Sequence, residues 1–294
     1  MDILKHLKSD KGFIAALDQS GGSSKKTLIN YGYKEEEITD DIVMFDYIHE
    51  MRRRIITDKS FNDEYILGAI LFKNTMKKDI NGINTVKYLR EKNIPSFLKI
   101  DIGLDNLCDG VQLLKDIPNL DNILDEALQY GIVGTKMRSV IKEYNEYGIK
   151  KLVDQQFDLA KKIISKGLIP IIEPEVDINS INKKNIESFL KKELMRNLDK
   201  MSKDQFLILK LTLPDLDGFY DNLLSYRNVL RIVALSGGYS KDNACDLLKN
   251  NKKMIASFSR ALIEGLNIKQ SDDEFSEKLA NNIKKIFDAS INKI

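Results

Sequence analysis

The stretch FLILKLTL at residues 206–213 decides the fold, because it alternates with a period of two and has a lysine at its centre. Successive side chains of a strand point to opposite faces of the sheet. One face of this stretch carries Leu207, Leu209, Leu211 and Leu213, and the other carries Phe206, Ile208, Lys210 and Thr212. A strand that is apolar along most of both faces is typical of a parallel sheet covered by helices.

Lys210 is the charged residue in the middle of this strand. Lysine is rarely buried completely, because removing an ammonium group from water costs several kcal/mol unless it is paired or loses its proton. Two interpretations therefore stay open from this strand alone. It is an edge strand whose lysine reaches water, or it is a covered strand whose lysine has a chemical task.

The composition is typical of a soluble α/β protein. The 294 residues suit one large domain or two smaller ones, and 43% of them are hydrophobic. With 46 Lys and Arg against 44 Asp and Glu, the net charge of +2 gives no general attraction to nucleic acid or anionic membranes. The segment MDILKHLKSD (1–10) lacks the apolar core of a signal peptide, and no apolar run approaches transmembrane length. We therefore expect a cytoplasmic protein.

Residues that bind metals well are scarce in this sequence. Cys108 and Cys245 are too few for a disulfide framework or a metal quartet, and His6 and His49 are too few for a three-histidine zinc site. We therefore expect neither a metal nor another cofactor.

Apolar runs that resemble strands recur along the whole chain. They are residues 12–18, 67–72, 96–101, 131–138, 168–175, 206–213, 230–238 and 254–261. Helical periodicity lies between them, most clearly in residues 41–56, 119–131, 148–167 and 240–250. Asn119 and Ser240 are candidate N-caps, and Gly167 is a candidate C-cap. Eight strands alternating with helices predict a (β/α)8 TIM barrel, formed as a single domain over residues 1–294. The long first connection, about residues 19–66, must hold more than one helix.

Polar residues follow or end most of the predicted strands, where such barrels place their active sites. They are Asp18, Lys99, Asp101, Lys136, Arg138, Glu173, Glu175, Lys210, the run Ser236-Gly237-Gly238, and Arg260. A single one of these residues is explained equally well by an ion pair at the rim. The whole set, converging on one rim, favours a site.

Two loops have the features of anion-binding sites. LSGGYS (235–240) opens a predicted helix, and glycines there let backbone N–H groups approach a phosphate. DQSGGSSKK (18–26) is a second loop of small residues. Two such sites on opposite sides of one rim indicate a sugar bisphosphate. The candidate phosphate-binding residues are Ser20, Ser23, Lys99, Arg138, Ser236, Gly237, Gly238 and Arg260.

The chemistry of Lys210 follows from its place among these groups. Burial and the cations Lys136 and Arg138, expected across the barrel, favour a neutral amine, which can attack a ketone and form a Schiff base. The protonated imine then stabilises a neighbouring carbanion, while the carboxylates Asp18, Glu173 and Glu175 are available to move protons. These groups fit the cleavage or formation of a carbon–carbon bond beside a ketone.

The sequence resembles the class I fructose-bisphosphate aldolases of the short bacterial kind along nearly its whole length. The resemblance is carried by ALDQSGGS (16–23), LKID (98–101), GTKMR (134–138), IIEPE (171–175), LKLTLP (209–214), LSGGYS (235–240) and SFSRAL (257–262). It implies reversible cleavage of fructose 1,6-bisphosphate to dihydroxyacetone phosphate and glyceraldehyde 3-phosphate, within glycolysis and gluconeogenesis.

The resemblance also implies roles for individual residues. Lys210 would form the Schiff base, Asp18 would handle the proton of the C4 hydroxyl, and Glu173 would act as acid and base around imine formation. Lys136 would assist electrostatically. Ser236, Gly237 and Arg260 match the site of one phosphate, and Ser20, Ser23 and Lys99 match groups near the other.

One departure and two alternatives stay open. Lys25, Lys26 and Thr27 stand where the longer animal enzymes carry an arginine, so the contacts of the second phosphate are not fixed. A tagatose-bisphosphate aldolase or a transaldolase would share Lys210. A non-catalytic barrel that binds sugar phosphates would need none of Lys210, Glu173 and Asp18 at these positions.

Overall fold

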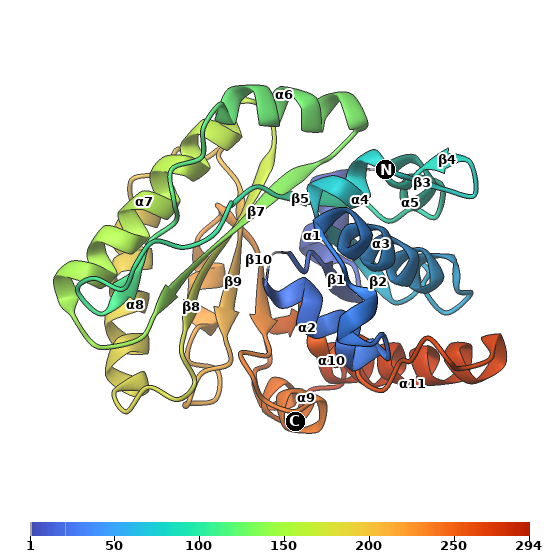
Figure 1. Cartoon of the computed structure of the whole chain (residues 1–294). Coiled ribbons are helices and arrows are strands. Elements are labelled where there is room, and N and C mark those ends of the chain that lie inside the picture. The colour runs from blue at the N-terminus through green and yellow to red at the C-terminus, as the bar shows by residue number, and fades with distance from the viewer. Residues whose placement is uncertain (1, 21) are drawn as a thin grey trace.

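Eight parallel strands form a nearly closed barrel in the computed structural model, which describes residues 2–20 and 22–294 except for the side chain of Ser23 (Figure 1). In spatial order they are β1 (Phe13–Leu17), β2 (Ile66–Leu71), β5 (Ser96–Lys99), β7 (Gly134–Ile141), β8 (Ile169–Val176), β9 (Leu207–Thr212), β10 (Val229–Leu235) and β11 (Met254–Ala256). Each strand overlaps one of the eight predicted runs, so the predicted barrel is confirmed, although β7 continues to Ile141 and β11 already ends at Ala256. β9 lies between β8 and β10, which excludes the edge-strand interpretation of Lys210.

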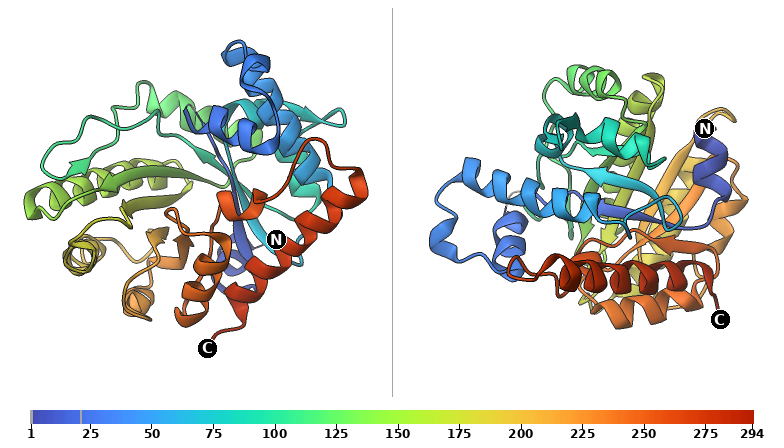
Figure 2. Two further views of the ribbon diagram at one scale, coloured as in Figure 1. Left: turned by 60° about the horizontal axis from the view of Figure 1, so that its bottom comes forward. Right: turned by 90° about the vertical axis from the view of Figure 1, so that its right-hand side faces the viewer.

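The helices lie outside the strands, as both views in Figure 2 show. Four of them, α3 (Asp41–Thr57), α6 (Leu120–Tyr130), α7 (Glu146–Ser165) and α9 (Lys241–Asn250), are where the periodicity predicts them. The others are α1 (Ile3–Ser9), α2 (Gly22–Tyr31), α4 (Lys73–Lys77), α5 (Thr85–Glu91), α8 (Lys183–Leu198), α10 (Arg260–Ile263) and α11 (Asp272–Ile291). The first connection holds α2, α3 and the short 3-10 helix Glu35–Glu37, as its length requires. Among the described residues, no helix is both long and apolar enough to cross a bilayer.

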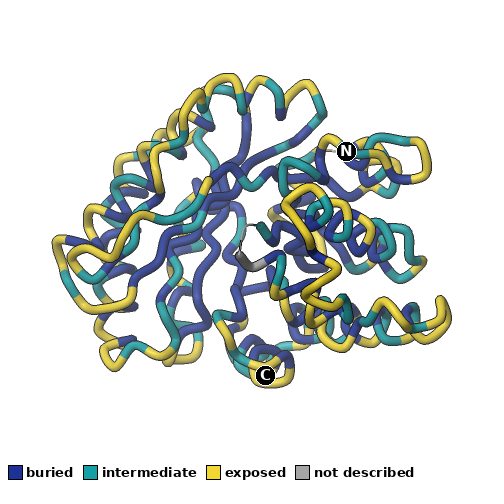
Figure 3. Tube along the Cα trace, in the orientation of Figure 1, coloured by how far each residue is buried: buried dark blue, intermediate teal, exposed yellow. Residues whose placement is uncertain are grey.

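Each face of the strands belongs to its own apolar cluster, one outside the barrel and one inside it. The outer cluster contains the leucine face of β9, which packs against the helices, whereas Ile208 belongs to the cluster inside the barrel. Figure 3 shows the strands as the most continuously buried part of the chain. Because Lys210 shares its face with Ile208, it points into the barrel and is only 3% exposed.

The polar residues of the site stand directly above this inner cluster. Ala16, Phe97, Ile171 and Ile208 fill the interior, and the strand residues two positions later are Asp18, Lys99, Glu173 and Lys210. On β7 the corresponding interior position is Gly134, two residues before Lys136. The alternation of each strand therefore places an apolar layer below a charged layer.

Helix α1 covers the opposite end of the barrel. Leu7 joins the inner cluster, Arg231 donates from Nε to the Leu7 carbonyl at 2.8 Å, and Nε2 of His6 is 2.9 Å from the Leu67 carbonyl oxygen. Arg231 and Leu67 lie near the starts of their strands, so α1 closes the N-terminal end. A ligand can then enter from the end where the strands stop.

Some local predictions need correction. DQSGGSSKK was predicted as a loop, but α2 begins at Gly22, within it. Asn119 precedes α6 in a left-handed conformation and makes no side-chain cap hydrogen bond, whereas Ser240 does cap α9. Gly167 lies one residue beyond the C-cap of α7, with φ +82°.

Three short strands escaped prediction altogether. They are the hairpin strands β3 (Asp79–Ile80) and β4 (Ile83–Asn84), and β6 (Val111–Gln112), which pairs with β7. Two residues are too few to show a period.

Gly134 provides a test of how tightly the layer below the site is packed. A Cβ there would lie 2.1 Å from the Ile169 carbonyl oxygen and 2.8 Å from the Phe97 ring. We expect Gly134→Ala to lower the free energy of unfolding by about 1–3 kcal/mol through overpacking, or more if the backbone cannot move.

Urea denaturation of the purified variant measures this loss. The control is Gly82→Ala, where a Cβ meets nothing within 4 Å and only the left-handed φ of +77° costs energy, about 1–2 kcal/mol. A Gly134→Ala protein as stable as the wild type would show that the layer can repack.

Candidate active site

A cavity of about 690 Å³ opens at the C-terminal ends of the strands. It is lined by ten of the twelve residues predicted for the site, namely Asp18, Ser20, Lys99, Lys136, Arg138, Glu173, Lys210, Ser236, Gly237 and Arg260. Gly238 is not among the lining residues, although its neighbour Gly237 is. The side chain of Ser23 lies outside the described part of the structure.

Glu173 lies between the two buried lysines of this cavity. Its Oε2 is 2.5 Å from Nζ of Lys136, and its Oε1 is 3.3 Å from Nζ of Lys210. Lys136 also donates to Oδ2 of Asp18 at 2.9 Å. The four side chains thus form one buried row of alternating charge, in the order Asp18, Lys136, Glu173, Lys210.

The charges in this row shift the pKa values of Asp18, Glu173 and Lys136. Burial alone would raise the pKa values of Asp18 and Glu173, but the ammonium groups of Lys136 and Lys210 outweigh it and hold both values below their ordinary range. Burial opposes the charge of Lys136, yet Asp18 and Glu173 raise its pKa above the usual value. Both carboxyl groups are therefore ionised at neutral pH.

The neighbour of Lys210 differs from the expectation. The cations of β7 were expected across the barrel from Lys210, but β7 and β9 are separated by β8 alone. The group in contact with the amine is the carboxylate of Glu173, at 3.3 Å.

Two residues predicted to bind phosphate are paired with carboxylates in this structure. Nε of Arg138 is 2.5 Å from Oε2 of Glu175, and Nζ of Lys99 is 2.5 Å from Oδ1 of Asp101. The Asp101 carboxylate also accepts from the backbone N–H of Arg138 at 3.2 Å. A phosphate that binds to Lys99 or Arg138 must compete with these carboxylates.

Ser236, Gly237, Gly238 and Arg260 gather at one side of the rim. Gly237 and Gly238 have φ values of +59° and +122°, which only glycine adopts readily. The Arg260 guanidinium lies 4.0 Å from the position that a Cβ on Gly238 would take. The next helix, α9, begins at Lys241, but the N–H groups of Lys241 and Asn243 donate to Glu264 and Ser240, so Ser236, Gly237 and Arg260 are the residues that face the cavity here.

One wall of the cavity is formed by α2 and by residues 263–266, and apart from Lys26 and Thr27 its residues were not predicted from the sequence. Lys26, Thr27, Asn30 and Tyr31 line the cavity from α2, and residues 263–266 line it from the other side. Lys25 points elsewhere and pairs with Glu35 at 2.8 Å. Positions 27, 30 and 31 have helical spacing, but the glycine-rich start of α2 concealed the helix.

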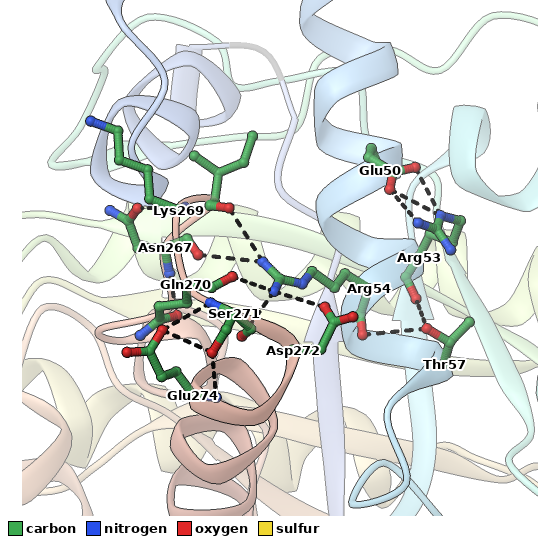
Figure 4. Close-up of polar contacts among 11 residues, drawn as sticks. Glu50, Arg53, Arg54, Thr57, Asn267, Lys269, Gln270, Ser271, Asp272 and Glu274 are labelled. Carbon is green, nitrogen blue, oxygen red and sulfur yellow. Dashed lines mark hydrogen bonds and ion pairs between the residues drawn. The ribbon is translucent and has the colours of Figure 1, made fainter.

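Arg54 of α3 binds the segment that follows residues 263–266, and Figure 4 shows its contacts with Gln270 and Ser271. Its guanidinium donates to the carbonyls of Gln270 at 2.7 Å and Ser271 at 3.1 Å, and stacks 4.1 Å from the ring centroid of Phe275. The Ile268 N–H donates to the Tyr31 carbonyl at 2.8 Å and so joins this segment to α2.

Lys136→Met tests the row of charges. We expect the variant to lose about 3–5 kcal/mol of unfolding free energy at pH 7, because two buried carboxylates lose a partner. In the wild type, the lowered pKa values of Asp18 and Glu173 contribute stability above their unfolded values of about 4, and this contribution is lost as the pH falls through the folded values.

In the variant a proton can take over the neutralising role of Lys136, so the difference in stability should narrow between pH 7 and pH 4.5. Urea denaturation of both proteins at the two pH values measures it. A difference that is the same at both values would show that the carboxylates do not depend on Lys136.

Comparisons with known proteins agree with this geometry. A family model described as fructose-bisphosphate aldolase class-I matches residues 4–213. A protein of Clostridium acetobutylicum named fructose-bisphosphate aldolase class 1 is 55% identical over 289 residues, which cover 98% of each chain.

Two solved structures share the fold. An aldolase of Plasmodium falciparum, solved with TRAP and an inhibitor, has 21% identity and a TM-score of 0.75, with 99% of this chain and 93% of that chain covered. A protein of Corynebacterium glutamicum has 9% identity and a TM-score of 0.56, with 98% and 91% covered. The family match and the 55% identical relative settle the family: this chain belongs to the class I fructose-bisphosphate aldolases, which are glycolytic lyases.

Proposed function

We propose that Lys210 is the residue on which this aldolase forms its Schiff base during reversible cleavage of fructose 1,6-bisphosphate. The observation that carries the proposal is the contact at 3.3 Å between Nζ of Lys210 and Oε1 of Glu173, at the floor of the cavity. It gives the amine a proton acceptor within reach. The products are dihydroxyacetone phosphate and glyceraldehyde 3-phosphate.

Imine formation uses Lys210 and Glu173. Glu173 accepts a proton from the ammonium group, and the neutral amine adds to the C2 ketone. A proton then passes from the added nitrogen to the former ketone oxygen, which gives a carbinolamine. Glu173 then returns a proton to the departing hydroxyl, and water leaves as the protonated imine forms. The same carboxyl group acts as base and then as acid, as its place beside the nitrogen allows.

Cleavage uses Asp18. Its carboxylate takes the proton of the C4 hydroxyl while the C3–C4 bond breaks, and the bonding electrons move into the imine to give an enamine. Because the pKa of Asp18 is held low by Lys136 and Lys210, the group is always ionised but weakly basic. It therefore accepts the proton as the bond breaks, when the hydroxyl becomes acidic. Glyceraldehyde 3-phosphate leaves, the enamine is protonated at C3, and water hydrolyses the imine to release dihydroxyacetone phosphate.

The phosphates are assigned to the two sides of the rim. Ser236, Gly237, Gly238 and Arg260 bind one of them, and Ser20, Lys26 and Lys99 bind the other, with Ser23 included on the resemblance alone. Lys26 and Arg260 both line the cavity, and neither has an ion pair within the described part of the chain. Arg138 is held by Glu175, so it shapes the rim between the phosphates.

We also propose that the chain acts as one barrel domain over residues 1–294 in the cytoplasm. The imine supplies the electron sink that another aldolase would obtain from a metal, so the mechanism requires no metal or other cofactor.

Borohydride trapping tests the assignment of Lys210. In the presence of dihydroxyacetone phosphate, borohydride should reduce the imine and attach the substrate irreversibly, and peptide mass mapping should place the added mass on Lys210. Lys210→Met should abolish both trapping and cleavage while the protein stays folded, because methionine removes the buried charge without changing the volume much.

Circular dichroism and thermal unfolding of Lys210→Met provide the control for folding. Label on Lys136 or Lys99, together with an active Lys210→Met protein, would overturn the assignment. A wild-type protein that neither traps the substrate nor cleaves fructose 1,6-bisphosphate would refute the proposed function itself.

Arg260→Lys tests the phosphate site next to Ser236. Lysine keeps the charge but lacks the two-pronged donor geometry that matches a phosphate. We expect kcat/KM for fructose 1,6-bisphosphate to fall roughly tenfold or more, the cost of one lost charge-assisted hydrogen bond.

Fructose 1-phosphate and fructose 6-phosphate are the matched substrates for this variant. One of them lacks the phosphate that Arg260 holds, so its kcat/KM should fall much less than that of the other. Equal losses for both monophosphates and for the bisphosphate would show that Arg260 has a structural role.

A further inference from the structure

The barrel is weakly closed between β1 and β11. Ladders of backbone hydrogen bonds join all the other neighbouring strands of the barrel, in the spatial order that runs from β1 to β11. No such ladder joins β11 back to β1, so the strand order does not close into a ring. Among the described residues, one backbone hydrogen bond crosses this seam, from the Ala16 N–H to the Phe258 carbonyl at 3.4 Å. That distance is long for such a bond. Asp18 follows β1 on one side of the seam, and Arg260 follows β11 on the other. Side-chain contacts across the seam can therefore hold Asp18 and Arg260 at a constant distance.

Arg52 of α3 lies behind this seam and is completely buried, with 0% exposure. It donates to the Gln19 carbonyl at 2.6 Å, to Oε1 of Gln19 at 3.2 Å and to Oγ1 of Thr75 at 2.6 Å. Among the described residues no carboxylate pairs with it, and Nε has no partner. Burial lowers the pKa of the guanidinium to about 9, so the group stays charged at neutral pH. The Asp18 carboxylate makes no ion pair with Arg52, but its charge opposes the effect of burial on the guanidinium pKa. A buried cation without a carboxylate in contact costs several kcal/mol, and apolar packing alone would not require it.

Gln19 connects Arg52 to Ser259 across the seam through the two ends of its side-chain amide. Because the guanidinium donates to Oε1, the amide nitrogen must point the other way, and it donates to Oγ of Ser259 at 2.7 Å. An amide held at one end by a cation cannot exchange its oxygen and nitrogen. The contact joins the residue after Asp18 to the residue before Arg260.

Helix α3 also contacts the segment after α10, on the β11 side of the seam. Arg54, two residues after Arg52, binds the carbonyls of Gln270 and Ser271 beyond α10 (Figure 4). Helix α3 therefore contacts the chain on both sides of the seam.

We propose that Arg52 is a positioning residue for phosphate binding, which acts through Gln19 and Ser259 to set Arg260 at a fixed distance from Asp18. It touches neither the substrate nor the reacting atoms. This inference rests on the proposed function, because it concerns the phosphate that Arg260 is assigned to bind.

The test is a steady-state comparison of Arg52→Met and Ser259→Ala with the wild type, using fructose 1,6-bisphosphate. Ser259→Ala breaks the far end of the connection and removes one oxygen from a half-buried side chain, so it serves even if Arg52→Met does not fold. We expect each variant to raise KM by about tenfold, within the range of coupling between contacting residues. Ser259→Ala, which keeps the charge of Arg52 near Asp18, should change kcat by less than about threefold. Arg52→Lys keeps the charge but cannot donate to Thr75 and Gln19 from two separate nitrogens, so it should also raise KM.

A second arm shows whether the effect passes through Arg260. In an Arg260→Ala background, Ser259→Ala and Arg52→Met should raise KM no further, because the group they position is gone. The matched control is Arg231→Met, which removes an arginine that binds two backbone carbonyls at the opposite end of the barrel. Its melting temperature should fall while its KM stays that of the wild type.

Three results would overturn the inference. They are an unchanged KM in Ser259→Ala, effects that add fully to that of Arg260→Ala, and a rise in KM for Arg231→Met equal to that for Arg52→Met. Each of them leaves wild-type cleavage and trapping on Lys210 intact, so the proposed function would survive. Loss of wild-type cleavage would instead remove the basis of both.

Discussion

The contact of Glu173 with both Lys136 and Lys210 is the constraint on which the rest of the site depends. Three charges cannot be buried together in a protein interior unless each is close to an opposite charge, because desolvation costs several kcal/mol for each ion. Asp18 completes the row and balances the two lysines. The row can form only if four side chains from β1, β7, β8 and β9 reach one layer of the barrel. The alternation of each strand ensures this, since the residues two positions below make up the apolar interior.

The parts of this arrangement that depend on local pattern could be predicted from the sequence. The leucine face of β9 fixed the direction of Lys210, and eight apolar runs fixed the number of strands. What depends on the stagger of neighbouring strands could not be predicted. The sequence shows that Lys136 and Lys210 point inward, but not that Glu173 separates them. Helix α2 was missed because glycine and serine, which weaken helix propensity, occupy its first turn.

The weakly closed seam between β1 and β11 is a second feature that could not be predicted from the sequence. β1 and β11 each have the residue types of an ordinary buried strand, so nothing in either segment predicts that the pair lacks a ladder. The contacts that replace the ladder come from Arg52 and Arg54, two members of a run of three arginines in α3. In the sequence this run was indistinguishable from a solvated helix face. The structure separates its members, since Arg52 is buried, Arg54 binds carbonyls, and Arg53 pairs with Glu50 at the surface.

The charges of the cavity explain why its two unpaired cations matter. Its lining contains six cations, from Lys26 to Arg260, and five carboxylates, including Glu264. A bisphosphate carries roughly −1.5 to −2 on each phosphate at neutral pH, so the small positive excess of the empty cavity does not by itself account for its binding. Lys99, Lys136, Arg138 and Lys210 each contact a carboxylate, and a phosphate gains from them only by displacing it. Lys26 and Arg260, which have no ion pair among the described residues, can meet a phosphate without that competition. Under the proposed assignment, binding is directed to the two ends of the sugar, and the row at the centre keeps its charges for the chemistry.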